Sequence, residues 1–200
     1  YANFFKIMKL KLFPLGIVAF PSKVIPLHIF EERYKKLINE CIDQKNEFGI
    51  IYRNNNGLAK IGCTVSVKKL VNRYPDGRMD ILSVGNKIFR LEDQTLINEI
   101  TVGDITYLPE PIQLPNQIFD PLKDKYIKLL IMLGLKENIN HHLTKTMTFE
   151  LLEMIQLPSQ FELELISINS EKKRAEVLNK FFDSMLNKSS LFNSNERFLS

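Results

Sequence analysis

Tryptophan is absent from this chain of 200 residues, and cysteine and glycine are scarce, with two and eight residues. Two cysteines cannot build a disulfide framework, so Cys41 and Cys63 are expected to be buried free thiols in a reducing cytoplasm. The longest uncharged apolar run, residues 12–21, is broken by proline and falls short of the roughly 20 residues of a membrane span. We therefore predict a cytoplasmic protein without a membrane partner.

Neither sign of charge dominates the sequence. The chain has 27 Lys and Arg residues against 23 Asp and Glu residues, which leaves a formal net charge of +4. These charges are interspersed, so the composition indicates a modestly basic surface and does not favour nucleic acid as a partner. With 44% hydrophobic residues, the chain can bury one substantial core, or one sheet core and a small helical bundle.

Sequence signatures of catalysis and cofactor binding are also missing. The chain contains no Gly-rich phosphate-binding loop, no Gly-x-Ser-x-Gly nucleophile elbow and no His-Glu-x-x-His zinc motif. His141 and His142 stand in a polar segment without further ligands, so solvated loop histidines are favoured over a metal site. Glu31 and Arg33 are interpreted as a helix cap or an ion pair, since no nucleophile accompanies them. We predict no catalytic residue, no cofactor and no metal.

Residues 12–34 are rich in apolar side chains and are interrupted by Pro14, Pro21 and Pro26. Each proline fixes φ and removes a backbone donor, so this stretch must form short extended pieces joined by turns. Between residues 31 and 42 the apolar side chains recur at helical spacing, behind an acidic pair that suits a helix start. The order strand, turn, strand, helix is predicted.

Residues 45–108 have the pattern of an antiparallel sheet. Apolar and polar side chains alternate over residues 61–68, which is typical of a strand with one buried face. Residues 75–77, Pro-Asp-Gly, are predicted to form a turn. Further strands are expected at residues 79–84, 86–91 and 97–107. Five or six strands with one early helix indicate a small, partly closed barrel.

Three prolines within residues 109–115 mark a stiff connector, and the pattern beyond it is helical. Asp120 is the expected N-cap of a helix whose first residue is Pro121. Further helices are expected over residues 149–157, from Ser159 and after Ser170. Residues 187–200, rich in Asn and Ser, are expected to be a flexible tail.

The opening block at residues 12–34 resembles the N-terminal substrate-recognition domain of the Lon family of ATP-dependent proteases. Later pieces follow in the family's order, at residues 48–51, 61–63, 76–78, 85 and 89–91. The sequence departs from the family at residues 96–100, where Glu99 is kept but a common Pro-Tyr is missing. It also ends before the family's ATPase module and Ser-Lys peptidase, so the resemblance implies a stand-alone, non-catalytic domain.

The resemblance implies an α+β fold, with a PUA-like β-barrel domain that contains one early helix and is followed by an α-helical bundle. The expected boundaries are residues 1–108 for the barrel, 109–117 for the connector, 118–186 for the bundle and 187–200 for the tail.

The resemblance also implies that the chain binds unfolded or tagged polypeptides, for an ATP-dependent protease supplied in trans. The sequence offers one candidate surface, an apolar strand over residues 17–20, in which Ile17, Val18 and Phe20 would contact an extended chain if exposed. Burial of the same residues in the core is the competing interpretation.

An alternative function is RNA binding, which PUA-like barrels perform in other families. Basic and aromatic side chains around the predicted hairpin would form the surface, namely Lys68, Lys69, Arg73, Tyr74 and Arg78. A solvated hairpin that resists aggregation explains the same charges. An enzyme of another type and a scaffold for one folded partner remain as further alternatives, and the sequence leaves the oligomeric state open.

Overall fold

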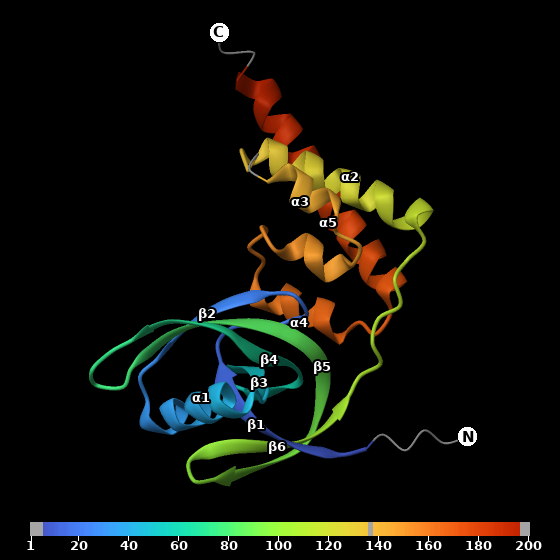
Figure 1. Ribbon diagram of the computed structural model, residues 1–200. Helices are drawn as coiled ribbons and strands as arrows, with labels where there is room; N and C mark the ends of the chain where they lie inside the picture. Colours follow the sequence, from blue (N-terminus) through green and yellow to red (C-terminus); the bar gives the residue numbers. More distant parts are fainter. Residues whose placement is uncertain (1–5, 136–137, 197–200) are drawn as a thin grey trace. The chain divides into compact units, whose positions relative to one another are not determined.

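The computed structural model describes residues 6–135 and 138–196, and the chain forms two compact units. One unit combines Tyr1–Glu110 with Leu157–Ser167, and the other combines Pro111–Gln156 with Ile168–Ser200. The first is rich in strands and the second is helical (Figure 1). The predicted α+β fold is therefore confirmed.

The first unit is built around a six-stranded sheet in the order β2-β5-β4-β3-β1-β6. Its elements are β1 (Met8–Leu15), β2 (Val24–Ile29), α1 (Glu32–Gln44), β3 (Phe48–Asn54), β4 (Gly57–Arg73), β5 (Met79–Ile97), β6 (Ile100–Tyr107) and α4 (Ser159–Ser167). Pairing of β5 with β6 closes five of the strands into a barrel, and β2 lies outside the ring on the first half of β5.

The strand β5 is a single element where the sequence pattern indicates two. It pairs with β2 and β4 over its first half and with β6 from Phe89 to Ile97. Register shifts along the β4–β5 and β5–β6 pairs mark bulges, which let a long strand bend around the barrel.

Two apolar layers stabilise the barrel unit. The barrel interior holds a fully buried cluster of Leu12, Ile51, Phe89 and Ile105. On the opposite face of β1, the ring of Phe13 stacks on Tyr34 of α1 with centroids 3.8 Å apart. Strand β1 thus contributes alternate side chains to both layers, as the period of two residues requires.

The second unit contains α2 (Asn116–Met132), α3 (Ile139–Leu143), the short 3₁₀ helix η1 (Thr148–Leu152) and α5 (Glu171–Glu196). Helix α2 begins four residues before the predicted N-cap Asp120, and Pro121 lies inside it. Helix α5 starts after Ser170 as expected but continues to Glu196, so the predicted tail at 187–200 is helical up to that residue. Residues 197–200 lie outside the described part of the chain.

The predicted bundle over residues 118–186 also differs from the observed division, because α4 groups with the barrel unit. Its Glu162 forms an ion pair with Lys23 of that unit, with nitrogen and oxygen 2.7 Å apart. Among the described residues, no helix is long and apolar enough to cross a membrane.

Buried polar groups hold the helical unit together. The guanidinium of Arg174 lies 4.0 Å from the ring centroid of Phe149 and pairs with the buried Glu171. Glu171 in turn accepts a hydrogen bond of 2.6 Å from the backbone of Thr148. The histidines expected in a solvated loop lie in α3 instead, where His142 is buried against Tyr126, with Oη and Nδ1 3.0 Å apart.

Candidate functional site

The segment expected to contact a polypeptide does not present its apolar side chains to solvent. Residues 17–20 lie outside any strand, and Val18 and Phe20 are each only 2% exposed. Ile17, at 38% exposure, is the one side chain of the predicted trio on the surface. The premise of an exposed apolar strand is therefore wrong, and the competing interpretation, burial in the core, holds for Val18 and Phe20.

Close packing of the backbone explains this burial. The carbonyl oxygen of Phe20 would lie only 2.0 Å from a Cβ atom added at Gly85, so the loop fits against the strand only because Gly85 has no side chain. Lys23 then holds the loop in place, since its ammonium donates to the carbonyl of Val18 at 2.8 Å and lies 4.6 Å from the Phe20 ring centroid.

The residues of the predicted RNA surface all lie on or near the β4–β5 hairpin, but several are already engaged with protein groups. Arg73 donates to Asn39 at 2.9 Å. Arg78 pairs with Asp76 at 2.7 Å, and its guanidinium lies 5.0 Å from the ring centroid of Tyr74. The hydroxyl group of Tyr74 donates to Asp80 at 2.7 Å.

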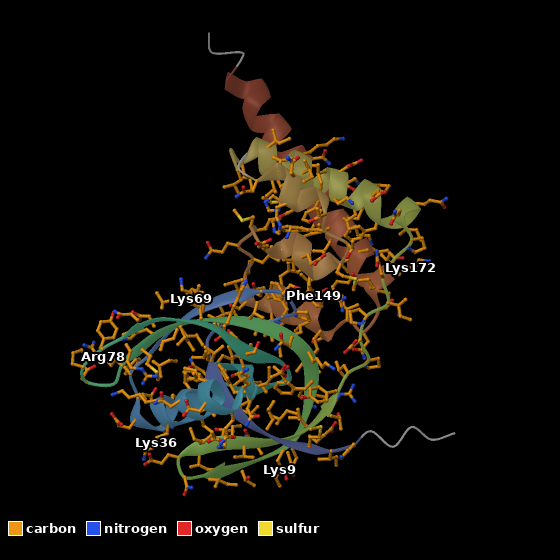
Figure 2. All side chains as sticks on the ribbon, viewed as in Figure 1. Lys9, Lys36, Lys69, Arg78, Phe149 and Lys172 are labelled. Atoms are coloured by element: carbon orange, nitrogen blue, oxygen red, sulfur yellow. The ribbon has the colours of Figure 1, made fainter. Side chains whose placement is uncertain are left out.

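Lys68 and Lys69 are exposed on β4, away from the hairpin turn. Figure 2 shows Arg78 at the tip of the long hairpin and Lys69 further along it. Lys69 and Arg78 therefore lie at different places along the hairpin.

A different feature of the barrel unit has the form of a binding site. A cleft of about 520 Å³ lies between α1 and the β5–β6 hairpin, and β1 contributes to its wall. Its lining residues are Lys11, Glu32, Arg33, Lys36, Leu37, Glu40, Ile97, Asn98, Glu99, Ile100 and Val102. This volume lies within the range of about 300–1,000 Å³ that is usual for ligand pockets.

The apolar part of the cleft comes from both walls. Leu37 belongs to the buried face of α1, while Ile100 and Val102 alternate along β6 and point to the same face of the sheet. Ile97, the register partner of Ile100, is 49% exposed and extends this apolar surface toward solvent.

The rim of the cleft is charged but balanced, with three cations and three carboxylates among its lining residues. Lys11 pairs with Glu40 at 2.5 Å. Arg33 also connects the two walls, because it donates to the backbone carbonyl of Glu99 at 3.2 Å. Its hydrogen bond to the neighbouring Glu31 raises the pKa of the Arg33 guanidinium, so this group stays charged.

The turn between β5 and β6 gives the hairpin wall its shape. Asn98 and Glu99 both have left-handed backbone conformations, with φ of 48° and 64°. Two consecutive residues of this kind form a tight turn whose twist matches the flanking strands. The turn places Ile97 and Ile100 opposite each other at the mouth of the cleft.

The chemistry of this cleft suits binding. No Ser, Cys or His stands among the residues described around it. Both cysteines are buried elsewhere, and burial raises the pKa of the Cys41 thiol to about 11 and that of Cys63 to about 12. Within the described chain, no three His, Cys, Asp or Glu side chains converge as metal ligands would.

A second hollow of about 530 Å³ is more open and lies beside the loop after β1 and the β3–β4 turn. Arg53, Asn54, Asn55 and two glycines form most of its wall. Its apolar lining residues are Pro14 and Leu15, whereas four apolar side chains line the α1 cleft, which we therefore take as the candidate site.

Sequence reasoning missed the cleft residues. Residues 97–107 are predicted as one strand because Asn98 is followed by Glu99 and not by the glycine that marks the strongest hairpin signal. One signal was available, since Asn is common in turns and tolerates the left-handed conformation. The helix that forms the opposite wall is predicted from the sequence, and its residues Arg33 and Lys36 line the cleft.

The model of one protein family matches residues 9–194, and its description is the substrate-binding domain of ATP-dependent protease La (LON). A Lon N-terminal domain protein from Xanthomonas campestris has a similar structure, with a TM-score of 0.68 and 24% sequence identity over 86% of this chain and 97% of that one. The N-terminal domain of a Mycobacterium avium complex Lon protease matches with a TM-score of 0.69 and 15% identity over 88% and 98% of the two chains. The two structural likenesses establish the fold, and the family match over residues 9–194 shows that this chain belongs to the LON substrate-binding domain family.

Proposed function

We propose that this chain recognises unfolded or tagged polypeptides and presents them to an ATP-dependent protease acting in trans. The cleft between α1 and the β5–β6 hairpin is the proposed site. The observation that carries the proposal is the apolar lining of this cleft in a member of a substrate-binding family: Leu37, Ile100 and Val102 form its nearly buried base, and Ile97, at 49% exposure, is its apolar side chain at the surface. Unfolded proteins expose the apolar side chains that such a surface accepts, and folded proteins bury most of them.

The charge of the cleft favours polypeptide over nucleic acid. A nucleic acid is bound chiefly through its phosphates, which requires an excess of Lys and Arg. Here the three lining carboxylates equal the three lining cations in number, so the electrostatic attraction for a polyanion is small. An extended polypeptide does not need such an excess of cations, because it can be held through its apolar side chains and its backbone.

The proposal is tested by the affinity of the chain for a permanently unfolded, fluorescently labelled polypeptide, measured by anisotropy. Ile97→Asp places a carboxylate on the apolar surface of the cleft, and we expect the Kd to rise at least about tenfold. The matched control is Ile118→Asp on α2, since Ile118 is 47% exposed and Ile97 is 49% exposed. This control variant is expected to bind as the wild type does.

Equal weakening by the two substitutions, or none by either, would place the binding surface outside this cleft. Affinity for single-stranded RNA that falls steeply with salt, without affinity for the polypeptide, would replace the proposal by the RNA alternative. Co-precipitation of an ATP-dependent protease from the same cells tests the partner separately.

A further inference from the structure

The second half of β5 has an open edge. Strand β4 pairs with β5 only as far as Arg90, whereas β6 continues to pair with it up to Ile97. Within residues 6–135 and 138–196, residues 92–97 therefore have a strand on one side only. All six of these residues are exposed. An exposed edge of this kind is a template for another strand.

The register shows which backbone groups face the open side. Ile97 and Ile100 flank the turn of two residues and form its closing pair, and hydrogen-bonded and non-bonded pairs alternate from there along an antiparallel ladder. Leu96 and Gln94 thus direct their N–H and C=O groups away from β6. The N–H of Gln94 already has an acceptor, because it donates a hydrogen bond of 2.7 Å to the carboxylate of Asp93.

The outward groups of Leu96 remain available, and they lie beside the candidate site. Alternate residues of the hairpin share a face, so Thr95 and Ile97 lie on the same side of the sheet as Val102 and Ile100, which line the cleft. A strand added next to Leu96 would direct every second side chain toward this face. Leu96, which is 71% exposed, lies on the other face, where it offers a second apolar contact.

Charge selects the kind of strand that fits. Glu92 and Asp93 lie on the open edge and Glu99 in the turn beside it, and among the described residues none of the three forms an ion pair. Glu92 accepts only the hydroxyl group of Thr106, at 2.5 Å. Two copies of this edge would bring like charges together, whereas lysine or arginine on an incoming segment would neutralise them.

We propose that an extended polypeptide segment that alternates apolar with basic residues pairs with the open edge of β5, through the backbone of Leu96. This inference deepens the proposed function and rests on it. Main-chain hydrogen bonds supply affinity for any unfolded segment, while Glu92 and Asp93 supply the preference for basic ones.

The decisive variant is Leu96→Pro. Because the N–H of Leu96 faces the open side, proline removes the donor offered to an incoming strand and leaves the pairing with β6 intact. Leu96→Ala is the matched control, since it loses the same side chain but keeps the N–H. The probe is a labelled peptide of ten residues in which Val and Lys alternate. A peptide of the same length in which Val and Glu alternate is the comparison.

For the Lys peptide we expect the Kd to rise about tenfold in Leu96→Pro and less than about threefold in Leu96→Ala. The Glu peptide is expected to bind the wild type at least about tenfold more weakly than the Lys peptide. Equal affinities of the two variants, or of the two peptides for the wild type, would overturn the proposal. If the variants bind equally while Ile97→Asp still weakens binding of the unfolded polypeptide, the proposed function stands and only the strand pairing fails.

A measurement on the wild type keeps the test independent of how the proline variant folds. Two methylated forms of the Lys peptide are compared, each with methyl groups on one of the two alternate sets of backbone nitrogens. If the peptide pairs with β5, methylation of the set whose N–H groups face β5 is expected to weaken binding about tenfold, and methylation of the other set is expected to have little effect. Unchanged binding of both methylated peptides would contradict the strand pairing. A dimer of this chain that Leu96→Pro dissociates, with peptide affinity unchanged, would also contradict it.

Discussion

Gly85 shows how one residue decides whether the loop after β1 can be a binding surface. The backbone of Phe20 approaches Gly85 so closely that any Cβ atom would collide with it. Two hydrogen bonds join the same segments, from Ser22 to the Gly85 carbonyl at 2.9 Å and from Gly85 to the Lys23 carbonyl at 3.0 Å. The loop is therefore a fixed part of the barrel unit.

Gly85→Ala is expected to destabilise the barrel unit by about 3 kcal/mol, because backbone rather than a flexible side chain must move. Gly16→Ala is the matched control, since nothing lies within 4 Å of a Cβ atom added there, and it is expected to change stability by less than about 0.5 kcal/mol. Urea unfolding measures both values. Equal stability of the two variants would show that the loop can leave Gly85 at little cost.

A buried histidine makes the helical unit sensitive to acid. Burial lowers the pKa of His142, and the nearby ammonium of Lys145 lowers it further. Tyr126, His141 and Glu153 complete the titratable groups around it. A histidine whose pKa is lowered by folding contributes stability above its unfolded pKa, near 6.5, and loses that contribution as the pH falls below it.

The stability of the helical unit is therefore expected to fall between pH 7.5 and 5.5, and the fall is expected to be smaller in His142→Phe. Hydrogen exchange of the α2 amides, measured at several pH values, reports this stability. A fall of the same size in wild type and variant would assign the acid sensitivity to other groups.

At the scale of elements, the β5–β6 hairpin gives the candidate site its outer wall. Its turn places Glu99 in a left-handed conformation that costs a residue of this type about 1 kcal/mol, whereas Asn98 tolerates the same conformation. Glu99→Gly is expected to raise the stability of the barrel unit by about 0.5 kcal/mol, because the relief of strain exceeds the added entropy of the unfolded chain.

Glu99→Ala separates the effect of conformation from that of charge, since alanine removes the carboxylate but keeps the strain. Thermal unfolding of both variants is the measurement. A gain in stability for alanine equal to that for glycine would show that charge, and not conformation, determines the cost of this turn.

The elements that the sequence predicts well are those with strong local signals. Helix α1, the alternating strand β4 and the turn at residues 75–77 occur as expected, because periodicity and a Pro-Asp-Gly motif specify them. The turn at Asn98 was missed because it lacks such a motif. Exposure and burial both remained open for Val18 and Phe20, because an apolar run does not reveal which of its faces is covered.

At the scale of the whole molecule, the limit of sequence reasoning lies in contacts between distant residues. Ser159 marks the start of α4 correctly, but local pattern cannot show that this helix groups with the barrel unit. The ion pair that joins them, Lys23 with Glu162, spans 139 residues of sequence. The candidate cleft depends on the same kind of contact, because α1 and the β5–β6 hairpin meet only in the folded barrel.

The most direct test of the proposed site is photocrosslinking to a labelled unfolded polypeptide, with a photoreactive amino acid at position 36 or at position 172. Figure 2 labels both lysines, and both are exposed, but only Lys36 lines the cleft. We expect the polypeptide to crosslink from position 36 and not from position 172. Binding that persists without a crosslink from position 36, or a crosslink from position 172 alone, would contradict the assignment of this cleft as the substrate site.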